Sequence, residues 1–116
     1  MIKNLKNLIP LENKISIFVP STMNADAKID STKEIEKTLE FLAKKFGGAT
    51  KIDCIGSWVS DTKGLINEKI SVCYSYTDTK GLKENIDDVL EYCEKLKKDM
   101  SQEVISLEVN NQLYFI

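Results

Sequence analysis

The chain has 116 residues, of which 42% are hydrophobic and 29% are charged, the balance of a single globular domain rather than a disordered segment. Eighteen acidic and sixteen basic residues give a net charge of −2, which argues against a nucleic-acid partner because phosphate binding needs a basic face. No apolar run approaches the roughly 20 residues that span a bilayer, and the N-terminus lacks an export signal, so we expect a cytoplasmic protein without membrane contact.

Two features restrict the chemistry. The sequence has no histidine, which removes Ser-His and Cys-His nucleophile pairs and imidazole metal ligands. Its three cysteines, Cys54, Cys73 and Cys93, are odd in number and widely spaced, as expected of reduced thiols. A CxxC pair, an acidic calcium loop and a P-loop are all missing from the sequence. We therefore expect no metal, no cofactor and no catalytic residue.

The first thirty residues hold one clear element. Residues 1–13 carry several aliphatic side chains and a proline, and form either a helical turn or an arm outside the core. Alternation in residues 14–19 predicts a strand whose Ile15, Ile17 and Val19 share one face, with Ser16 and Phe18 on the other. Residues 20–30 are a long polar loop, either functional or a plain connection.

The first helix has a start signal, an apolar stripe and a stop signal. Ser31 and Glu34 match a capping box, in which each side chain satisfies a free backbone N–H. An apolar stripe at helical spacing follows, consisting of Ile35, Leu39, Leu42 and Phe46. Gly47 and Gly48 end the helix, because glycine accepts the left-handed conformation common at helix C-termini.

A hairpin of residues 49–60 and 65–76 comes next, and it organises the predicted fold. Its even-numbered positions are the more apolar, so we expect them to face the helices together. A bulged turn at residues 62–64, with Gly64 left-handed, pairs Asp61 with Leu65. This register places Trp58 opposite Glu68. It also pairs Ile52 with Tyr74, Cys54 with Val72 and Gly56 with Ile70.

The C-terminal part supplies a second helix and two strands. Asp78 or Thr79 caps a helix with the apolar stripe Leu82, Ile86, Val89, Cys93, Leu96 and Met100. Residues 103–109 and 113–116 form strands joined at Asn110–Asn111, which can adopt the positive φ values of a two-residue turn. This turn places Leu107 opposite Tyr114 and Ile105 opposite Ile116. The order β-α-β-β-α-β plus a terminal strand predicts an α+β, ferredoxin-like single domain over 1–116, with an antiparallel sheet and both helices on one face.

Two groups of residues are candidate sites. The odd-numbered hairpin face, taken with Phe18, gives a candidate interaction face of Phe18, Ile55, Val59 and Cys73, whose simplest use is sheet-to-sheet packing of a homodimer. The alternative is an ordinary half-apolar surface. Because Phe18 is the only aromatic residue expected on this face, base stacking is disfavoured. Trp58 and Glu68 form either a candidate pocket with one acid or an aromatic rim on the core.

The hairpin also carries a resemblance. F-G-G-A-T at residues 46–50, G-x-W at residues 56–58, the turn residue Gly64 and the strand residue Glu68 resemble an uncharacterised bacterial domain-of-unknown-function family and related small plasmid and phage proteins. The resemblance implies a non-enzymatic accessory protein in the host cytoplasm. Such a protein would bind a protein partner and inhibit a host defence system, as an anti-CRISPR protein does. The alternative is a dimeric ferredoxin-like protein that binds or converts a small molecule between its sheet and helices.

Overall fold

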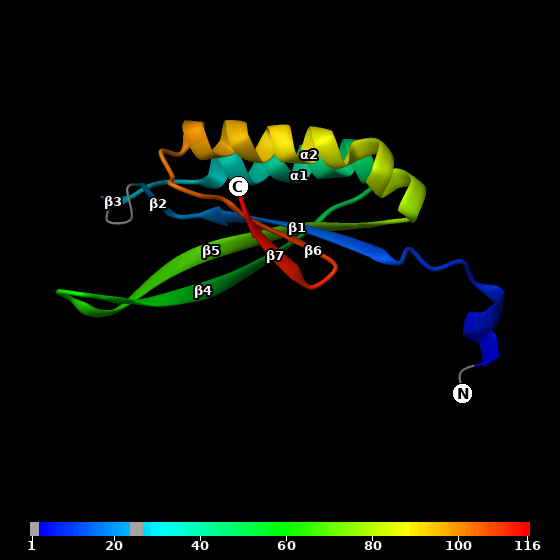
Figure 1. The fold of residues 1–116 in the computed structure, drawn as a ribbon, viewed down its shortest axis with the longest axis horizontal. Coiled ribbons are helices and arrows are strands. Elements are labelled where there is room, and N and C mark those ends of the chain that lie inside the picture. Colours follow the sequence, from blue (N-terminus) through cyan, green and yellow to red (C-terminus); the bar gives the residue numbers. More distant parts are fainter. Residues whose placement is uncertain (1–2, 24–26) are drawn as a thin grey trace.

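The computed structural model describes residues 3–23 and 27–116, which form two layers (Figure 1). Helices α1 (Thr32–Phe46) and α2 (Thr79–Asp99) lie side by side on one face of a five-stranded sheet. The hairpin of β4 (Thr50–Ser60) and β5 (Gly64–Thr77) extends beyond the helices at one end of the molecule. The N-terminal segment, with the 3-10 helix η1 (Lys3–Asn7), projects from the opposite end.

The sheet confirms the predicted topology. Strand β1 (Asn13–Pro20) is central, with β5 on one side and β6 (Ser106–Val109) on the other. The order is β4-β5-β1-β6-β7, where β7 (Gln112–Phe115) is the extra C-terminal strand, and each neighbouring pair is antiparallel. The predicted loop of residues 20–30 contains two short paired strands, β2 (Thr22–Met23) and β3 (Ala27–Lys28). Part of that prediction, residues 24–26, lies outside the described residues.

The helix ends follow the sequence signals with one correction. Gly47 is left-handed, with φ 90°, and its N–H donates to the Ala43 carbonyl, so the predicted stop of α1 is confirmed. The predicted capping box is wrong, because the Ser31 side chain makes no capping hydrogen bond. Asp30 acts instead, and its Oδ1 accepts from the N–H of Thr32 at 3.0 Å and from its hydroxyl at 2.6 Å. Asp78 caps α2 as predicted, accepting from the N–H of Gly81 at 2.7 Å.

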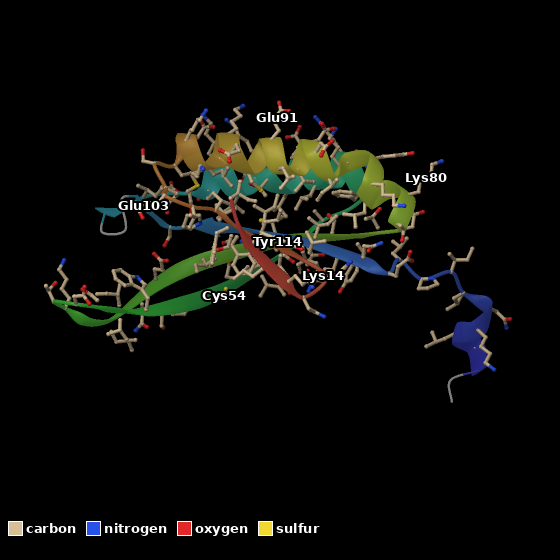
Figure 2. The ribbon with its side chains drawn as sticks, in the orientation of Figure 1. Lys14, Cys54, Lys80, Glu91, Glu103 and Tyr114 are labelled. Carbon is tan, nitrogen blue, oxygen red and sulfur yellow. The ribbon has the colours of Figure 1, made fainter. Side chains whose placement is uncertain are left out.

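The core lies between the sheet and the two helices. Ile15, Ile17 and Val19 of β1 are at most 1% exposed and pack beneath the predicted stripes of α1 and α2. The charged side of α2 points away from the sheet, as Glu91 illustrates in Figure 2. In the last hairpin, Asn110 and Asn111 have positive φ values and Leu107 pairs with Tyr114, as predicted. Ile105 and Ile116 exchange backbone hydrogen bonds of 2.9 and 3.1 Å, which confirms their pairing.

The register of the long hairpin differs from the prediction by two residues. Gly64 is left-handed as expected, with φ 72°, but it pairs with Ser60, and the turn is residues 61–63. The Ser60 hydroxyl accepts from the N–H groups of Thr62 at 3.3 Å and Lys63 at 3.2 Å, which closes the turn one residue early. Trp58 therefore lies opposite Ile66, and Glu68 lies opposite Gly56. A shift of two keeps the parity, so Trp58 and Val72 still share a face.

The larger correction concerns which hairpin face meets the helices. Ile17 of β1 pairs with Cys73, and both are fully buried beneath the helices. The odd-numbered positions of β4 and β5 therefore form the helix-side face of the hairpin. The even-numbered positions, predicted to face the helices, lie on the opposite side, which we call the open face, with Phe18 opposite Val72. The prediction failed because it assigned the more apolar set to the core, whereas β5 turns small Ser and Cys side chains toward the helices.

At the start of α2, we expect a glycine-to-alanine substitution to destabilise the protein, which is the opposite of its usual effect in a helix. Alanine normally stabilises a helix relative to glycine by about 1 kcal/mol. A Cβ at Gly81, however, would overlap the Thr77 hydroxyl and come within 3.1 Å of Asp78 Oδ1, the capping atom. We expect Gly81→Ala to lower the free energy of unfolding by about 1 kcal/mol, measured by urea denaturation, because the cap must move. Lys83→Ala, at an exposed position of α2, is the control, and a G81A variant as stable as the parent would contradict the prediction.

Candidate functional site

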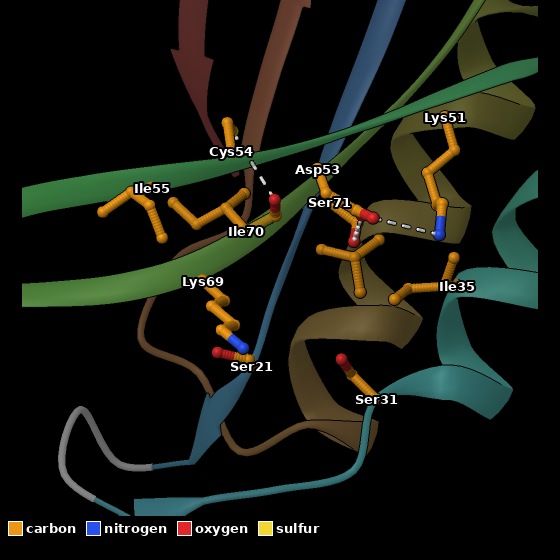
Figure 3. A pocket seen from close by; sticks show the side chains of 11 residues that line it. Ser21, Ser31, Ile35, Lys51, Asp53, Cys54, Ile55, Lys69, Ile70 and Ser71 are labelled. Atoms are coloured by element: carbon orange, nitrogen blue, oxygen red, sulfur yellow. Dashed lines mark hydrogen bonds and ion pairs between the residues drawn. The ribbon is translucent and has the colours of Figure 1, made fainter.

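A cavity of about 410 Å³ lies at the base of the long hairpin, where the helices no longer cover its helix-side face (Figure 3). Its floor consists of β4 and β5 residues, including Lys51, Asp53 and Ser71. The end of β1 and the start of α1 form its wall, with Ser31 at the N-cap position and Ile35 in the first turn of the helix. Cavities of this volume hold small-molecule ligands.

Asp53 is the acid of this cavity, and it is held in its ionised form. Its Oδ1 accepts a hydrogen bond of 2.7 Å from the hydroxyl of Ser71, which lies directly opposite on β5, and its Oδ2 lies 3.3 Å from Lys51 Nζ. The Ser71 hydrogen bond, followed by that from Lys51, lowers the pKa of the Asp53 carboxyl below its usual value, and the charge of Lys69 acts in the same direction. Asp53 is therefore an acceptor for cationic groups at neutral pH.

The rest of the lining includes both positive and apolar groups. Lys51 and Lys69 line the cavity, and the N-terminal end of α1, where the helix dipole is positive, borders it at Ser31. Val19, Ile35 and Ile55 supply apolar surface. A cavity with one fixed carboxylate, two ammonium groups and apolar walls suits a ligand that carries charges of both signs and an apolar body.

Two of the three thiols are too deeply buried to act as nucleophiles at this site. Cys73 is fully buried, and burial raises the pKa of its thiol to about 11. Burial likewise raises the pKa of Cys93 to about 12. Cys54 lines the cavity, and its Sγ lies 3.5 Å from the Ile70 carbonyl oxygen, to which it donates. Within the described residues, no group of three or more Cys, Asp or Glu side chains is arranged to hold a metal ion.

The structure separates the members of the candidate interaction face. Ile55 and Val59 lie on the helix-side face of the hairpin, 61% and 75% exposed, and Ile55 lines the cavity. Cys73 is on the same face but fully buried, so the expectation that it shares an exposed face with Phe18 is wrong. The premise used against base stacking is also wrong, because Tyr74 lies on the open face beside Phe18. A partner-binding role for this group stays a prediction.

Trp58 and Glu68 both lie on the open face, in neighbouring cross-strand pairs. Trp58 is 42% exposed, and Glu68 is partly buried opposite Gly56. Neither residue lines the cavity at the hairpin base. Their use as a ligand pocket stays a prediction.

Sequence reasoning missed the residues of the cavity as a site. The sequence does contain a signal for this site, because strand alternation places Lys51, Asp53, Lys69 and Ser71 on one face. They were assigned to the face away from the helices, so their position beside the first turn of α1 was not recognised. The register error also placed Asp53 opposite Cys73, whereas the hydrogen-bonded pair is Asp53 and Ser71.

No family model and no curated relative matches the sequence. Two solved structures match its fold. One is a phage SAM lyase in complex with S-methyl-5'-thioadenosine, with 21% identity and a TM-score of 0.66, covering 94% of this chain and 92% of that chain. The other is a phage SAM lyase in the apo state, with 19% identity and a TM-score of 0.62, covering 90% and 87% of the two chains.

These matches correct the functional expectation. The expected function was a non-enzymatic inhibitor that acts by protein–protein contact, but the protein whose fold this chain shares is an enzyme. The alternative, a ferredoxin-like protein with a small-molecule pocket between sheet and helices, agrees better with the matches and with the cavity beside α1. The protein in this match comes from a phage, whereas no family model matches the family that the hairpin resembles. In the described residues, no helix is long and apolar enough to cross a membrane.

The Asp53 interactions give a prediction for its titration. Because the Ser71 hydrogen bond is the largest cause of the lowered pKa, we expect Ser71→Ala to raise that pKa toward the usual value. Lys51→Met should raise it less. The folded-state pKa is below the unfolded-state value, so this contribution to stability exists above about pH 4 and is lost as the pH falls.

Carboxyl ¹³C NMR titration measures the effect directly. Ser57→Ala is the matched control, since Ser57 lies farther along β4 and bonds to Asn67. An Asp53 pKa that is the same in S71A and in the parent would contradict the assigned cause.

Proposed function

We propose that this protein cleaves S-adenosylmethionine at the hairpin-base cavity and releases S-methyl-5'-thioadenosine. The observation that carries the proposal is the fold match to a phage SAM lyase bound to that compound, over more than nine tenths of both chains. The cavity between sheet and α1 supports it independently, because its charges and volume suit such a ligand.

The substrate and the cavity have complementary chemistry. S-adenosylmethionine has two cationic groups, an ammonium and a sulfonium, together with a carboxylate and a flat adenine. Asp53, ionised and directed by Ser71, is the acceptor for the substrate ammonium. Val19, Ile35 and Ile55 offer the apolar surface on which the adenosine packs. We assign Asp53 as a binding and positioning residue and assign no residue as a general acid or base.

The reaction we propose is internal to the substrate. Formation of S-methyl-5'-thioadenosine requires cleavage of the bond between sulfur and Cγ of the aminobutyrate arm. The substrate carboxylate attacks Cγ, a C–O bond forms as the C–S bond breaks, and the electron pair passes to sulfur. The second product is homoserine lactone, a five-membered ring. No water is added, as the word lyase requires, and this cyclisation transfers no proton.

This route suits a chain without histidine. The nucleophile and the leaving group are both parts of the substrate, so the protein has only to hold them in line, which by itself accounts for large rate enhancements. The positive sulfonium and the negative carboxylate neutralise each other in the transition state, so apolar walls favour the reaction. All three cysteines are free thiols, and two of them, Cys73 and Cys93, are buried. Free thiols agree with the reducing cytoplasm, which is the location that we propose.

Product analysis tests the proposal. Purified protein incubated with S-adenosylmethionine should yield S-methyl-5'-thioadenosine and homoserine lactone in equal amounts, measured by mass spectrometry and NMR. Homoserine would indicate hydrolysis instead, and vinylglycine would indicate elimination. Loss of substrate at no more than the uncatalysed rate would refute the proposed function.

A matched pair of variants tests the site. We expect Asp53→Asn to lower kcat/KM roughly ten- to a hundredfold, because a charge-assisted hydrogen bond to the substrate is lost. Asp88→Asn is the control, since Asp88 pairs with Lys45 at 2.7 Å and does not line the cavity. Equal losses in the two variants would argue against the assigned site while leaving the reaction itself unaffected.

A further inference from the structure

The cavity at the hairpin base contains one ammonium group that the protein does not pair with a carboxylate. Among the described residues, the charged side chains that line it are Asp53, Lys51 and Lys69. Lys51 is engaged, since its Nζ lies 3.3 Å from Asp53 Oδ2. In the part of the chain that the structure describes, the Lys69 ammonium makes no hydrogen bond or ion pair and acts on Asp53 only through its charge. The cavity therefore has a positive group available for an anion.

The strand register brings Lys69 next to Asp53 and its partners. Asp53 pairs with Ser71, and the next pair on the same face of the hairpin joins Ile55 to Lys69. Because a strand rises about 3.3 Å per residue, these two pairs are about 6.6 Å apart along the hairpin. Figure 3 shows Lys69 and Lys51 on opposite sides of Asp53. The acidic group and the unpaired ammonium are thus neighbours on one surface.

Asp53 has acceptor capacity left for a ligand. An ionised carboxylate accepts about four hydrogen bonds. Asp53 uses one for the Ser71 hydroxyl at 2.7 Å and one for Lys51. The Asp53 side chain is 67% exposed, so its remaining acceptor positions are accessible. Together, Asp53 and Lys69 present both halves of a site for a ligand with a positive and a negative group close together.

An α-amino acid has this pattern of charge, because its ammonium and its carboxylate are attached to the same carbon. When the ammonium donates to Asp53, the carboxylate lies within reach of the long, flexible Lys69 side chain. The contact between the Lys69 ammonium and this carboxylate is a charge-assisted hydrogen bond, which is stronger than a neutral one. The cavity therefore suits the amino-acid arm of a ligand as a unit.

We propose that Lys69 binds the carboxylate of the substrate's amino-acid arm and makes the cavity selective for ligands that carry a complete amino acid. This inference deepens the proposed function and rests on it for the identity of the substrate. Asp53 holds the ammonium, and Lys69 is a binding and specificity-determining residue. One carboxylate oxygen pairs with Lys69, which leaves the other oxygen to attack Cγ.

The same contact distinguishes the substrate from the product. Ring closure converts the charged carboxylate into a neutral ester, so homoserine lactone has no anionic group for Lys69. The ion pair is therefore stronger in the bound substrate than in the transition state, where the carboxylate is losing its charge. We expect Lys69→Met to raise KM about tenfold and to change kcat less than about threefold, because it removes an interaction of the ground state.

Isothermal titration calorimetry with two unreactive ligands tests the proposal without turnover. S-adenosylhomocysteine carries the amino acid but no sulfonium, and its decarboxylated analogue carries the ammonium alone. We expect the parent protein to bind S-adenosylhomocysteine about tenfold more tightly than the analogue. Lys69→Met should remove this preference without weakening the analogue, and Lys69→Arg should keep most of it. Lys44→Met is the matched control, since Lys44 is 74% exposed in the last turn of α1 and pairs with Glu40.

Several results would overturn the role of Lys69. These are a parent protein that binds neither ligand or binds both equally, an equal loss of both ligands in K69M, and an unchanged preference in K69M. The last result would place the carboxylate at another positive group, such as the start of α1. A kcat loss in K69M at unchanged KM would also contradict the proposal.

The outcomes separate this inference from the proposed reaction. A Lys69-dependent preference for S-adenosylhomocysteine in a protein that does not turn over S-adenosylmethionine would refute the reaction alone. Turnover by a protein that lacks the preference would refute the Lys69 assignment alone.

Discussion

The structure depends on the alternation of small and large side chains along β5. Ser71, Cys73 and Ser75 point toward the helices and are at most 8% exposed, whereas the larger Val72, Tyr74 and Tyr76 point to the open face. Small residues on the helix-side face let α1 pack closely against β5. The aliphatic core beneath the helices then comes from β1, β6 and the helices themselves. A large side chain at position 73 would force this layer apart.

The same alternation explains which parts of the fold the sequence predicts. Helix α2 and its apolar stripe, the Asp78 cap, the Gly47 stop and the final hairpin all follow from local signals, so they were predicted correctly. Which face of a strand meets a helix is decided by packing across layers. There, hydrophobicity favoured the wrong set, because a fully buried Ser or Cys contributes fit rather than apolar area. Despite the two-residue register error and the wrong face assignment, the prediction of which hairpin residues share a face is correct. Two registers that differ by two residues leave the same side chains together on one face.

The position of the candidate site is a consequence of element lengths. Strands β4 and β5 continue past the first turn of α1, so the helix-side face of the hairpin leaves the core while it still lies next to a helix end. Polar residues occur on that face at the point where cover is lost, and there Asp53, Ser71 and Lys51 form their network. Local spacing contains no motif for this arrangement, since it joins two strands and a helix start that are separated in sequence. Only a correct face assignment would have revealed it.

The absence of histidine does not by itself argue against catalysis. A missing imidazole excludes reactions in which the protein must supply a nucleophile, base or metal ligand. It does not exclude a reaction whose nucleophile and leaving group are both parts of the substrate. For such a reaction, the requirements are a cavity, a fixed charge to orient the substrate, and apolar walls that favour the loss of charge. In the reaction that we propose, the hairpin-base cavity would meet these requirements with ordinary residues such as Asp53 and Ser71.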